Sequence, residues 1–211
     1  MKIALLTSPD QWFIPYAQEL AAQLENAVLF FRHEDISEQY SWVFILSYHR
    51  IIPKIELSKH QHNFVIHASN LPQGKGWAPL FWQILEGKNE IPFSLIEASE
   101  KIDEGIIYQQ AILVLTGYEL NEELRAKQAR LIQQMCRNFI ANPQRFENII
   151  LPTAEESIYR RRTAKDSKLD IDKSLREQFN LLRIVNNKAY PAFFEIDGQR
   201  YTVKIEHDEQ S

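Results

Sequence analysis

The sequence has little of several features that would place a protein in a specialised class. It contains one cysteine, Cys136, among 211 residues. A single cysteine cannot form an internal disulfide, which excludes a disulfide-stabilised secreted scaffold and favours a reducing compartment. No apolar run approaches the roughly 18 residues that span a bilayer, and the opening MKIALLTSP is too short an apolar run for a signal peptide. We therefore expect a cytoplasmic protein with no membrane partner.

An excess of charge of one sign is also absent. The chain has 24 Lys and Arg against 28 Asp and Glu, a net charge of −4, which gives no global attraction for a nucleic-acid backbone. We therefore expect no nucleic-acid partner. The 45% apolar and 25% charged content is that of an ordinary globular chain, long enough for one good core plus an appendage. Monomer and homodimer both stay open.

Short apolar runs alternate with helical patterns over the first 150 residues. The runs at 2–6, 27–31, 42–46, 63–66, 93–97 and 106–115 indicate strands, because β-branched and aromatic residues follow one another in them. Helical spacing of apolar residues marks 15–24, 79–86 and 119–141. The alternation predicts an α/β fold, a Rossmann-like and mostly parallel sheet with flanking helices. We expect this catalytic domain to span residues 1–152.

The character of the chain changes after Pro152. A polar and basic segment, YRRRTAKDSKLD, is followed by a short helical pattern at 175–185. Residues 192–196 and 201–205 resemble the two strands of a hairpin that turns through Asp197 and Gly198. We therefore predict a small α+β carboxyl-terminal subdomain over residues 153–211.

A histidine at the end of an apolar run marks the candidate site. His67 follows the strand pattern 63–66 and precedes a turn rich in Pro and Gly, and Asp103 comes much later, in the sequence KIDEG. In open α/β sheets, ligands bind outside the carboxyl ends of the strands. An acid bonded to one imidazole nitrogen orients the ring and stabilises its charged form. His67 and Asp103 together can therefore act as a proton acceptor and its orienting partner.

These motifs resemble the 10-formyltetrahydrofolate-dependent formyltransferases. VIHASNLPQGKGWAP and IDEG are similar to the family's Asn-x-His-x-Ser-x-Leu-Pro, Arg-Gly loop and Asp-x-Gly. LSYHRIIPK is similar to its folate-binding loop, and YRRRTAKDSKLD to the segment that opens its carboxyl-terminal part. The motifs occur in the family's order over most of the chain. Within the family, HASNLPQGKGW resembles the short sugar N-formyltransferases of pseudaminic-acid-type nucleotide-sugar pathways.

The resemblance implies an N-formyltransferase without a metal. It would move the formyl group of 10-formyltetrahydrofolate to the primary amine of a nucleotide-linked amino sugar, a UDP-4-amino-4,6-dideoxy sugar. His67 and Asp103 would be catalytic, and Gly76, Trp77, Arg160 and Arg161 would contact the acceptor, the arginines through its diphosphate. The residues expected at the folate are Leu46, Ser47, Tyr48, His49, Arg50, Ile51, Ile52, Glu97 and Ile102.

The chain departs from the family at one position. Where the family has an Asn whose amide polarises the formyl oxygen, this chain has Val65, and a valine cannot donate a hydrogen bond. Losing one such donor costs about 2.7–4 kcal/mol of transition-state stabilisation. Asn70, on the loop after His67, is the preferred replacement, and Asn63 is the other candidate.

Other interpretations remain open. Asp103 is also a good turn residue, and the arginines at 160–162 also fit a salt-bridged surface. His60, His62 and His67 suggest a metal hydrolase, although five extended residues from His62 to His67 span roughly 16 Å, too far for one ion. A folate-binding protein with weak or no transferase activity and a methionyl-tRNA-type formyltransferase are the remaining alternatives.

Overall fold

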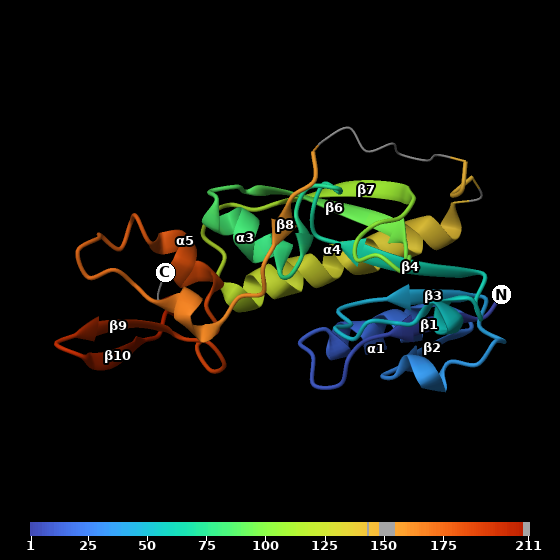
Figure 1. Cartoon of the computed structure of the whole chain (residues 1–211), viewed down its shortest axis with the longest axis horizontal. Helices are drawn as coiled ribbons and strands as arrows, with labels where there is room; N and C mark the ends of the chain where they lie inside the picture. The colour runs from blue at the N-terminus through green and yellow to red at the C-terminus, as the bar shows by residue number, and fades with distance from the viewer. Residues whose placement is uncertain (143, 148–154, 209–211) are drawn as a thin grey trace.

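The computed structural model of the protein describes residues 1–142, 144–147 and 155–208. Its centre is a six-stranded sheet in the order β2-β1-β3-β4-β6-β7 (Figure 1). The first four strands are parallel, whereas β6 is antiparallel to both β4 and β7. The strands are β1 (Ile3–Leu6), β2 (Ala27–Phe30), β3 (Trp42–Ile45), β4 (His62–His67), β6 (Glu90–Glu97) and β7 (Ile107–Val114). The prediction of a mostly parallel, Rossmann-like α/β sheet is thus confirmed.

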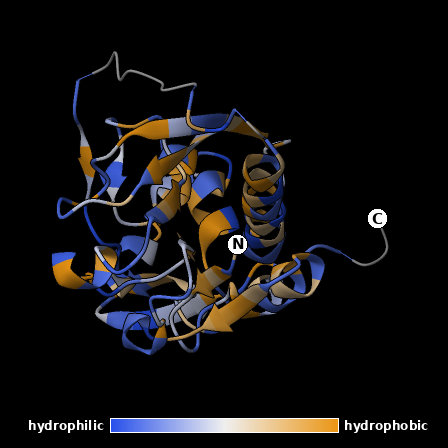
Figure 2. Ribbon diagram, turned by 90° about the vertical axis from the view of Figure 1, so that its right-hand side faces the viewer, coloured by the Kyte–Doolittle hydropathy of each residue, from blue (hydrophilic) through white to orange (hydrophobic). Residues whose placement is uncertain are grey.

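The larger core lies between one face of the sheet and three helices. These are α1 (Ile14–Gln23), α3 (Pro79–Leu85) and α4 (Asn121–Ala141), whose buried residues pack on Phe44, Phe64 and Phe93. A smaller cluster covers Val43 and Ile45 on the other face, next to the short helix α2 (Lys54–Leu57). Figure 2 shows hydrophobic residues concentrated in the strands and on the helix faces turned toward them. No helix in the described ranges is long and apolar enough to cross a membrane.

Most elements lie where the sequence patterns predict them, with one shifted hairpin strand. The hairpin pairs β9 (Ala192–Ile196) with β10 (Gln199–Val203), so the second strand begins two residues before the expected Tyr201. Asp197 and Gly198 both have positive φ. Such a two-residue turn places Ile196 directly opposite Gln199, which sets the register. The expected helix at 175–185 is shorter, with α5 at Phe179–Ile184.

The carboxyl-terminal part is attached to the rest of the chain by α5. Ile184 belongs to the larger core, while Leu169, Leu182, Val185 and Ala192 form a small cluster beside the hairpin. Figure 1 shows this part at one end of the molecule, beside α3 and the start of α4. The domain boundary expected at residues 152 and 153 lies outside the described residues.

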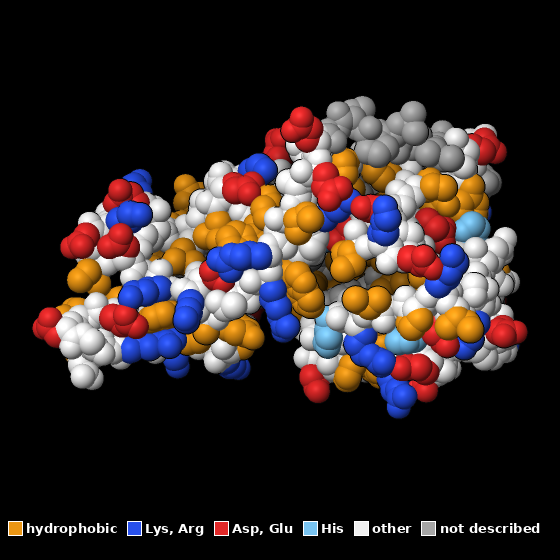
Figure 3. Space-filling model, in the orientation of Figure 1, with side chains coloured by type: hydrophobic (Ala, Val, Ile, Leu, Met, Phe, Trp, Pro, Cys, Tyr) orange, Lys and Arg blue, Asp and Glu red, His pale blue; other side chains and the backbone are white. Residues whose placement is uncertain are grey.

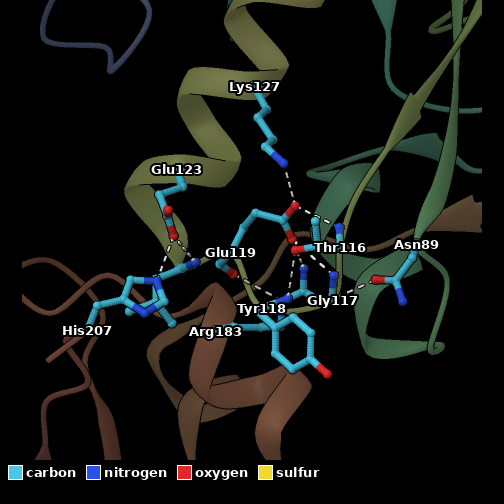
Figure 4. Close-up of polar contacts among 10 residues, drawn as sticks. Asn89, Thr116, Gly117, Tyr118, Glu119, Glu123, Lys127, Arg183 and His207 are labelled. Carbon is cyan, nitrogen blue, oxygen red and sulfur yellow. Dashed lines mark hydrogen bonds and ion pairs between the residues drawn. The ribbon is translucent and has the colours of Figure 1, made fainter. Parts of the chain in front are cut away.

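A buried ion pair joins α5 to the segment before α4 (Figure 4). Arg183, 1% exposed, donates from Nη2 to Glu119 Oε2 over 2.8 Å, from Nε to the Glu119 carbonyl, and from Nη1 to Asn89. Glu119 also accepts from Lys127 and from the backbone amides of Thr116 and Gly117. Arg183 and Glu119 therefore each have several hydrogen-bond partners, which is the condition for burying an ion pair without loss of stability.

Candidate active site

His67 is the last residue of β4, at the carboxyl edge of the parallel strands. His67 is 8% exposed. The loop that follows it contains the cis peptide between Leu71 and Pro72. Its Nδ1 lies 3.4 Å from Asp103 Oδ1, and its Nε2 donates to the Gly74 carbonyl over 2.8 Å. The structure thus brings together the two residues that the sequence nominates for proton transfer.

Asp103 reaches His67 from the loop between β6 and β7. It has a positive φ of 52°, and its second carboxylate oxygen accepts a hydrogen bond of 2.8 Å from the Gly76 amide. Two residues later, a Cβ on Gly105 would lie 1.9 Å from the Glu97 carbonyl oxygen, so a side chain does not fit there. Asp-x-Gly is therefore the spacing that lets this loop fold back onto the sheet.

The loop after His67 is fixed by the carboxyl-terminal chain. Its short strand β5 (Lys75–Gly76) pairs in parallel with β8 (Ile158–Tyr159), which crosses in front of α3 in Figure 1. Lys75 is buried, and its Nζ contacts Glu104 at 2.8 Å and Glu156 at 2.7 Å. Burial lowers the pKa of Lys75, but the two carboxylates outweigh it and raise the pKa.

Lys75 is a candidate site residue that the sequence reasoning missed. The residues on either side of it hold His67 and Asp103, since the Gly74 carbonyl bonds His67 and the Gly76 amide bonds Asp103. Its two ion pairs connect this tripeptide to the residue after Asp103 and to the carboxyl-terminal chain. The sequence feature that could have pointed to Lys75 is its position between Gly74 and Gly76 in the motif HASNLPQGKGW.

The two candidate donors for the formyl oxygen lie at opposite ends of β4. Asn63 is buried at the amino end, where its Nδ2 donates to the Leu57 carbonyl. Asn70 is exposed beyond His67, and its Oδ1 accepts from Gln110 Nε2 over 2.9 Å. This bond fixes the amide orientation of Asn70, with Oδ1 toward Gln110 and Nδ2 available. Gln110, on β7, is a second residue that the sequence reasoning missed.

The loop expected to hold folate follows β3 and contacts the start of the chain. Leu46 is buried, the His49 amide donates to Ser8 Oγ, and the Tyr48 hydroxyl bonds His33 Nδ1. Arg50 forms two hydrogen bonds with Glu34, and this contact lowers the pKa of Glu34 to about 2. Three residues complete the loop: Ser47 with positive φ, Ile51, which is 74% exposed, and Ile52, which packs in the smaller cluster.

A cavity of about 730 Å³ lies beside α2, and none of the loop residues 46–52 lines it. Its walls come from α2 and the residues up to Asn63 on one side, and from residues 97–101 with Glu104 and Gly105 on the other. A cavity of this size accommodates a small organic ligand. Neither His67 nor Asp103 lines it, although Glu104 and Gly105, the two residues after Asp103, belong to its wall.

Two further residues expected at the folate occupy different environments. Glu97 belongs to the cavity wall, but its carboxylate accepts from the Asn63 amide, from Tyr108 and from His62. Burial, followed by the charge of Glu97, raises the pKa of Tyr108 to about 12. Ile102 is 61% exposed on the loop next to Asp103. The Glu97 carboxylate thus already has three protein partners.

The residues expected to contact the acceptor lie along α3. Gly76 and Trp77 precede this helix, and the Arg161 guanidinium lies 4.9 Å from the centre of the partly exposed Trp77 ring. Arg160 forms a two-pronged ion pair with Asp166 and lies 4.8 Å from the Trp82 ring. Arg161 therefore has its charge available on the surface, whereas Arg160 is compensated.

The histidines of the alternative metal site have separate partners. His60 Nδ1 contacts the Tyr40 carbonyl, and His62 contacts Glu97 and stacks on Phe64. Within the described residues, no group of three or more His, Cys, Asp or Glu side chains could hold a metal ion. The three histidines of this interpretation thus do not converge on one point.

Comparison with known proteins agrees with this geometry. The formyl transferase family matches residues 32–138. The structure is similar to a methionyl-tRNA formyltransferase from Clostridium thermocellum, at a TM-score of 0.80 and 20% identity, over 100% of this chain and 95% of that chain. It is also similar to a sugar N-formyltransferase from Shewanella sp. FDAARGOS_354, at a TM-score of 0.70 and 17% identity, over 99% and 98%.

A third similar structure is that of HypX from Aquifex aeolicus in complex with tetrahydrofolic acid. The TM-score is 0.72 at 15% identity, over 97% of this chain and 37% of the longer HypX chain. At these identities the likeness shows the fold, while the family match spans half of the sequence and includes β4, the His67 loop and the Asp103 loop. The chain therefore belongs to the formyl transferase family, and it is a transferase.

Proposed function

We propose that this transferase moves the formyl group of 10-formyltetrahydrofolate to the amine of a nucleotide-linked 4-amino sugar of the pseudaminic-acid type. The observation that carries the proposal is the contact between His67 and Asp103 at the carboxyl edge of the sheet. The cavity whose wall includes Glu104 and Gly105 of the Asp103 loop supports a folate site beside that loop, as does the tetrahydrofolic acid complex of the structurally similar HypX.

The chemistry follows from the positions of these groups. The amine nitrogen attacks the formyl carbon, the bond from that carbon to folate N10 breaks, the amine gives up a proton and N10 takes one up. His67 accepts the proton at Nε2 while Asp103 holds Nδ1. Nε2 donates to the Gly74 carbonyl in this structure, so this contact has to break before catalysis, with the imidazole hydrogen on Nδ1 toward Asp103 and the acceptor amine in place of the carbonyl.

The intermediate places negative charge on the former formyl oxygen, which requires a donor. Val65 provides none, and the Asn63 amide is used at the other end of β4. We assign the role to Asn70, whose Nδ2 is free while Gln110 holds its oxygen. The polar wall beside it is completed by Ser94, which accepts from Gln110 and donates to the Ser69 carbonyl.

The choice of an amino-sugar acceptor rests on the resemblance of HASNLPQGKGW to sugar N-formyltransferases, with support from the Shewanella structure. The net charge of −4 argues against a tRNA acceptor. The similarity to the methionyl-tRNA formyltransferase from Clostridium thermocellum supports that alternative. A folate-binding protein without turnover is the other alternative.

One experiment separates the three. The purified protein is incubated with 10-formyltetrahydrofolate and either a panel of UDP-linked amino sugars or methionyl-tRNA, and products are identified by mass spectrometry. We expect a formylated sugar nucleotide and unmodified methionyl-tRNA. Formylation of the tRNA alone would favour the methionyl-tRNA-type enzyme, and folate binding without any product across the panel would favour the binding protein.

A further inference from the structure

Two arginines near the site form no direct ion pair with a carboxylate in the described part of the chain. Arg125 lies on α4, and its one side-chain hydrogen bond in the described structure goes from Nη1 to Gln128. Arg162, three residues after β8, donates from Nη2 to the Asp166 carbonyl, and its buried Nε has no hydrogen-bond partner. The Asp166 carboxylate bonds Arg160 and Thr163 instead. Both guanidinium groups therefore have N–H donors without a protein acceptor, in a region where positive charge is not balanced by an ion pair.

The positive charge of Arg162 acts unfavourably on Arg125. Burial, and after it the charge of Arg162, lowers the pKa of Arg125 to about 9. Burial also lowers the pKa of Arg162, against the opposing effect of Asp166. The other buried cations differ, since Lys75 has two glutamates and Arg183 has Glu119. A partly buried pair of like charges is costly in itself, and a bound anion removes that cost.

Aromatic rings set the orientation of Arg125. Its guanidinium carbon lies 4.4 Å from the centre of the Trp12 ring and 4.3 Å from that of Phe81. The rings restrict the side chain, so that its N–H groups are presented in a fixed arrangement at little further entropic cost. A planar guanidinium held in this way matches the oxygens of a phosphate group better than any other side chain.

Arg125 and Arg162 lie near the same edge of the sheet as His67. Trp12 lies between β1 and α1, Phe81 is in α3 directly after the His67 loop, and β1 is separated from β4 by β3 alone. Ligands of open α/β sheets bind at this carboxyl edge. In Figure 3, Lys and Arg side chains gather beside the hollow between the carboxyl-terminal part and the rest of the molecule.

We propose that Arg125 and Arg162 form an anion site that binds the diphosphate of the nucleotide-linked acceptor. The proposal rests on the proposed function, because it names where the phosphate groups of that substrate lie. Arg125 donates through the fork held between Trp12 and Phe81, and Arg162 supplies a second positive charge that the protein leaves incompletely bonded, since its buried Nε has no partner. Arg161, next to Arg162 in the chain, and Trp77, whose ring it contacts, then lie on the outer side of the ligand.

The test is calorimetric titration of the full chain with UDP and, separately, with inorganic pyrophosphate. Arg125→Met and Arg162→Met each remove a charged donor, and we expect each to weaken binding about 10- to 100-fold. Arg137→Met is the matched control, because Arg137 lies on the same helix and bonds Gln23, and its affinity should equal that of the wild type. Equal affinities in all four proteins, or no binding of either ligand to the wild type, would overturn the proposal.

A conservative variant separates a binding role from a folding role. Arg125→Lys keeps the charge but not the fork, so the protein should stay folded and still lose affinity for pyrophosphate. Transfer assays distinguish this proposal from the function itself. If a sugar nucleotide is formylated with an unchanged KM in both Met variants, the function stands and the anion site is wrong. If nothing is formylated but UDP binding still depends on both arginines, the anion site stands and the acceptor assignment is wrong.

Discussion

Two arginines beside the start of α4, the buried Arg183 and the partly buried Arg125, have opposite electrostatic surroundings. Arg183 uses Nε, Nη1 and Nη2 on Glu119 and Asn89, and Glu119 in turn is bonded by Lys127 and two backbone amides (Figure 4). Arg125 has one neutral side-chain partner, two aromatic neighbours and a second arginine close enough to lower its pKa.

The difference separates two uses of a buried cation. Where all donors are satisfied within the protein, as at Arg183, the cation holds elements together and has nothing left for a ligand. Where donors and charge are left over, as at Arg125, the folded chain tolerates a cost that only an added anion offsets. Lys75, with two glutamates, belongs to the first kind although it lies next to the catalytic pair.

The first prediction separates chemistry from binding. His67→Asn removes the proton acceptor, and we expect kcat to fall at least about 1000-fold, the combined scale of general-base catalysis and orientation. Affinity for UDP and for folate should stay within a factor of about three, because the arginines and the cavity are untouched. An unchanged kcat would remove His67 from the mechanism.

The second prediction compares the two arginines by stability. Arg183→Met leaves Glu119 without its main buried partner and should lower the free energy of unfolding by about 3–5 kcal/mol. Arg125→Met removes an uncompensated charge while keeping contact with Trp12 and Phe81, so the ligand-free protein should be no less stable than the wild type. Urea unfolding measures both. Equal losses for the two variants would abolish the distinction drawn here.

The third prediction concerns the oxyanion donor. Asn70→Ala should lower kcat about 10- to 1000-fold on the scale of a lost oxyanion donor. Gln110→Ala, which frees the Asn70 amide to rotate, should have a smaller effect that disappears in the Asn70→Ala background. Val65→Asn restores an amide at the family's usual position and should recover part of the activity of Asn70→Ala. A silent Asn70→Ala would exclude Asn70 as the donor.

The fourth prediction is the acid dependence of the Arg183 network. Burial alone would raise the pKa of Glu119, but Lys127 and Thr116 outweigh it and hold the pKa at about 2, below the usual 4.5. A depressed pKa contributes stability above pH 4.5 that is lost as the pH falls from there toward 2. At about 1.4 kcal/mol per pKa unit, this amounts to about 3 kcal/mol.

Glu119→Gln should therefore flatten the fall in unfolding free energy between pH 4.5 and 2. Glu123→Gln is the control, because Glu123 lies on the neighbouring turn with an exposed carboxylate and its pKa is lowered to a smaller extent by the Leu120 amide and His207. Identical acid profiles for Glu119→Gln and the wild type would contradict the assignment.

The sheet was predictable because its strands are short apolar runs rich in β-branched and aromatic residues, a pattern that indicates buried strands. The helix and strand patterns located β1, β3, β4 and α4 within a few residues, and the order of motifs indicated that His67 and Asp103 would meet. The antiparallel direction of β6 was not predictable, because strand direction depends on how the long loops return. The two-residue strands β5 and β8 carry no periodic signal and form only because distant segments pair.

The charge balance of the arginines was equally hidden from the sequence. The run at 160–162 suggested a phosphate site at Arg160 and Arg161, yet the structure pairs Arg160 with Asp166 and brings the charge of Arg162 near enough to lower the pKa of Arg125. Arg125 comes from a helix pattern with nothing unusual around it. Whether a cation is compensated depends on three-dimensional neighbours, so the sequence could name the basic segment but not the arginine with free donors.

The most direct test of the account is the rate of formyl transfer from 10-formyltetrahydrofolate to UDP-linked 4-amino sugars, measured side by side for the wild type, His67→Asn and Asp103→Asn. The account predicts a formylated sugar nucleotide from the wild type, and a loss of at least about 1000-fold in kcat for both variants with folate still bound. Turnover at wild-type rates in either variant would contradict it.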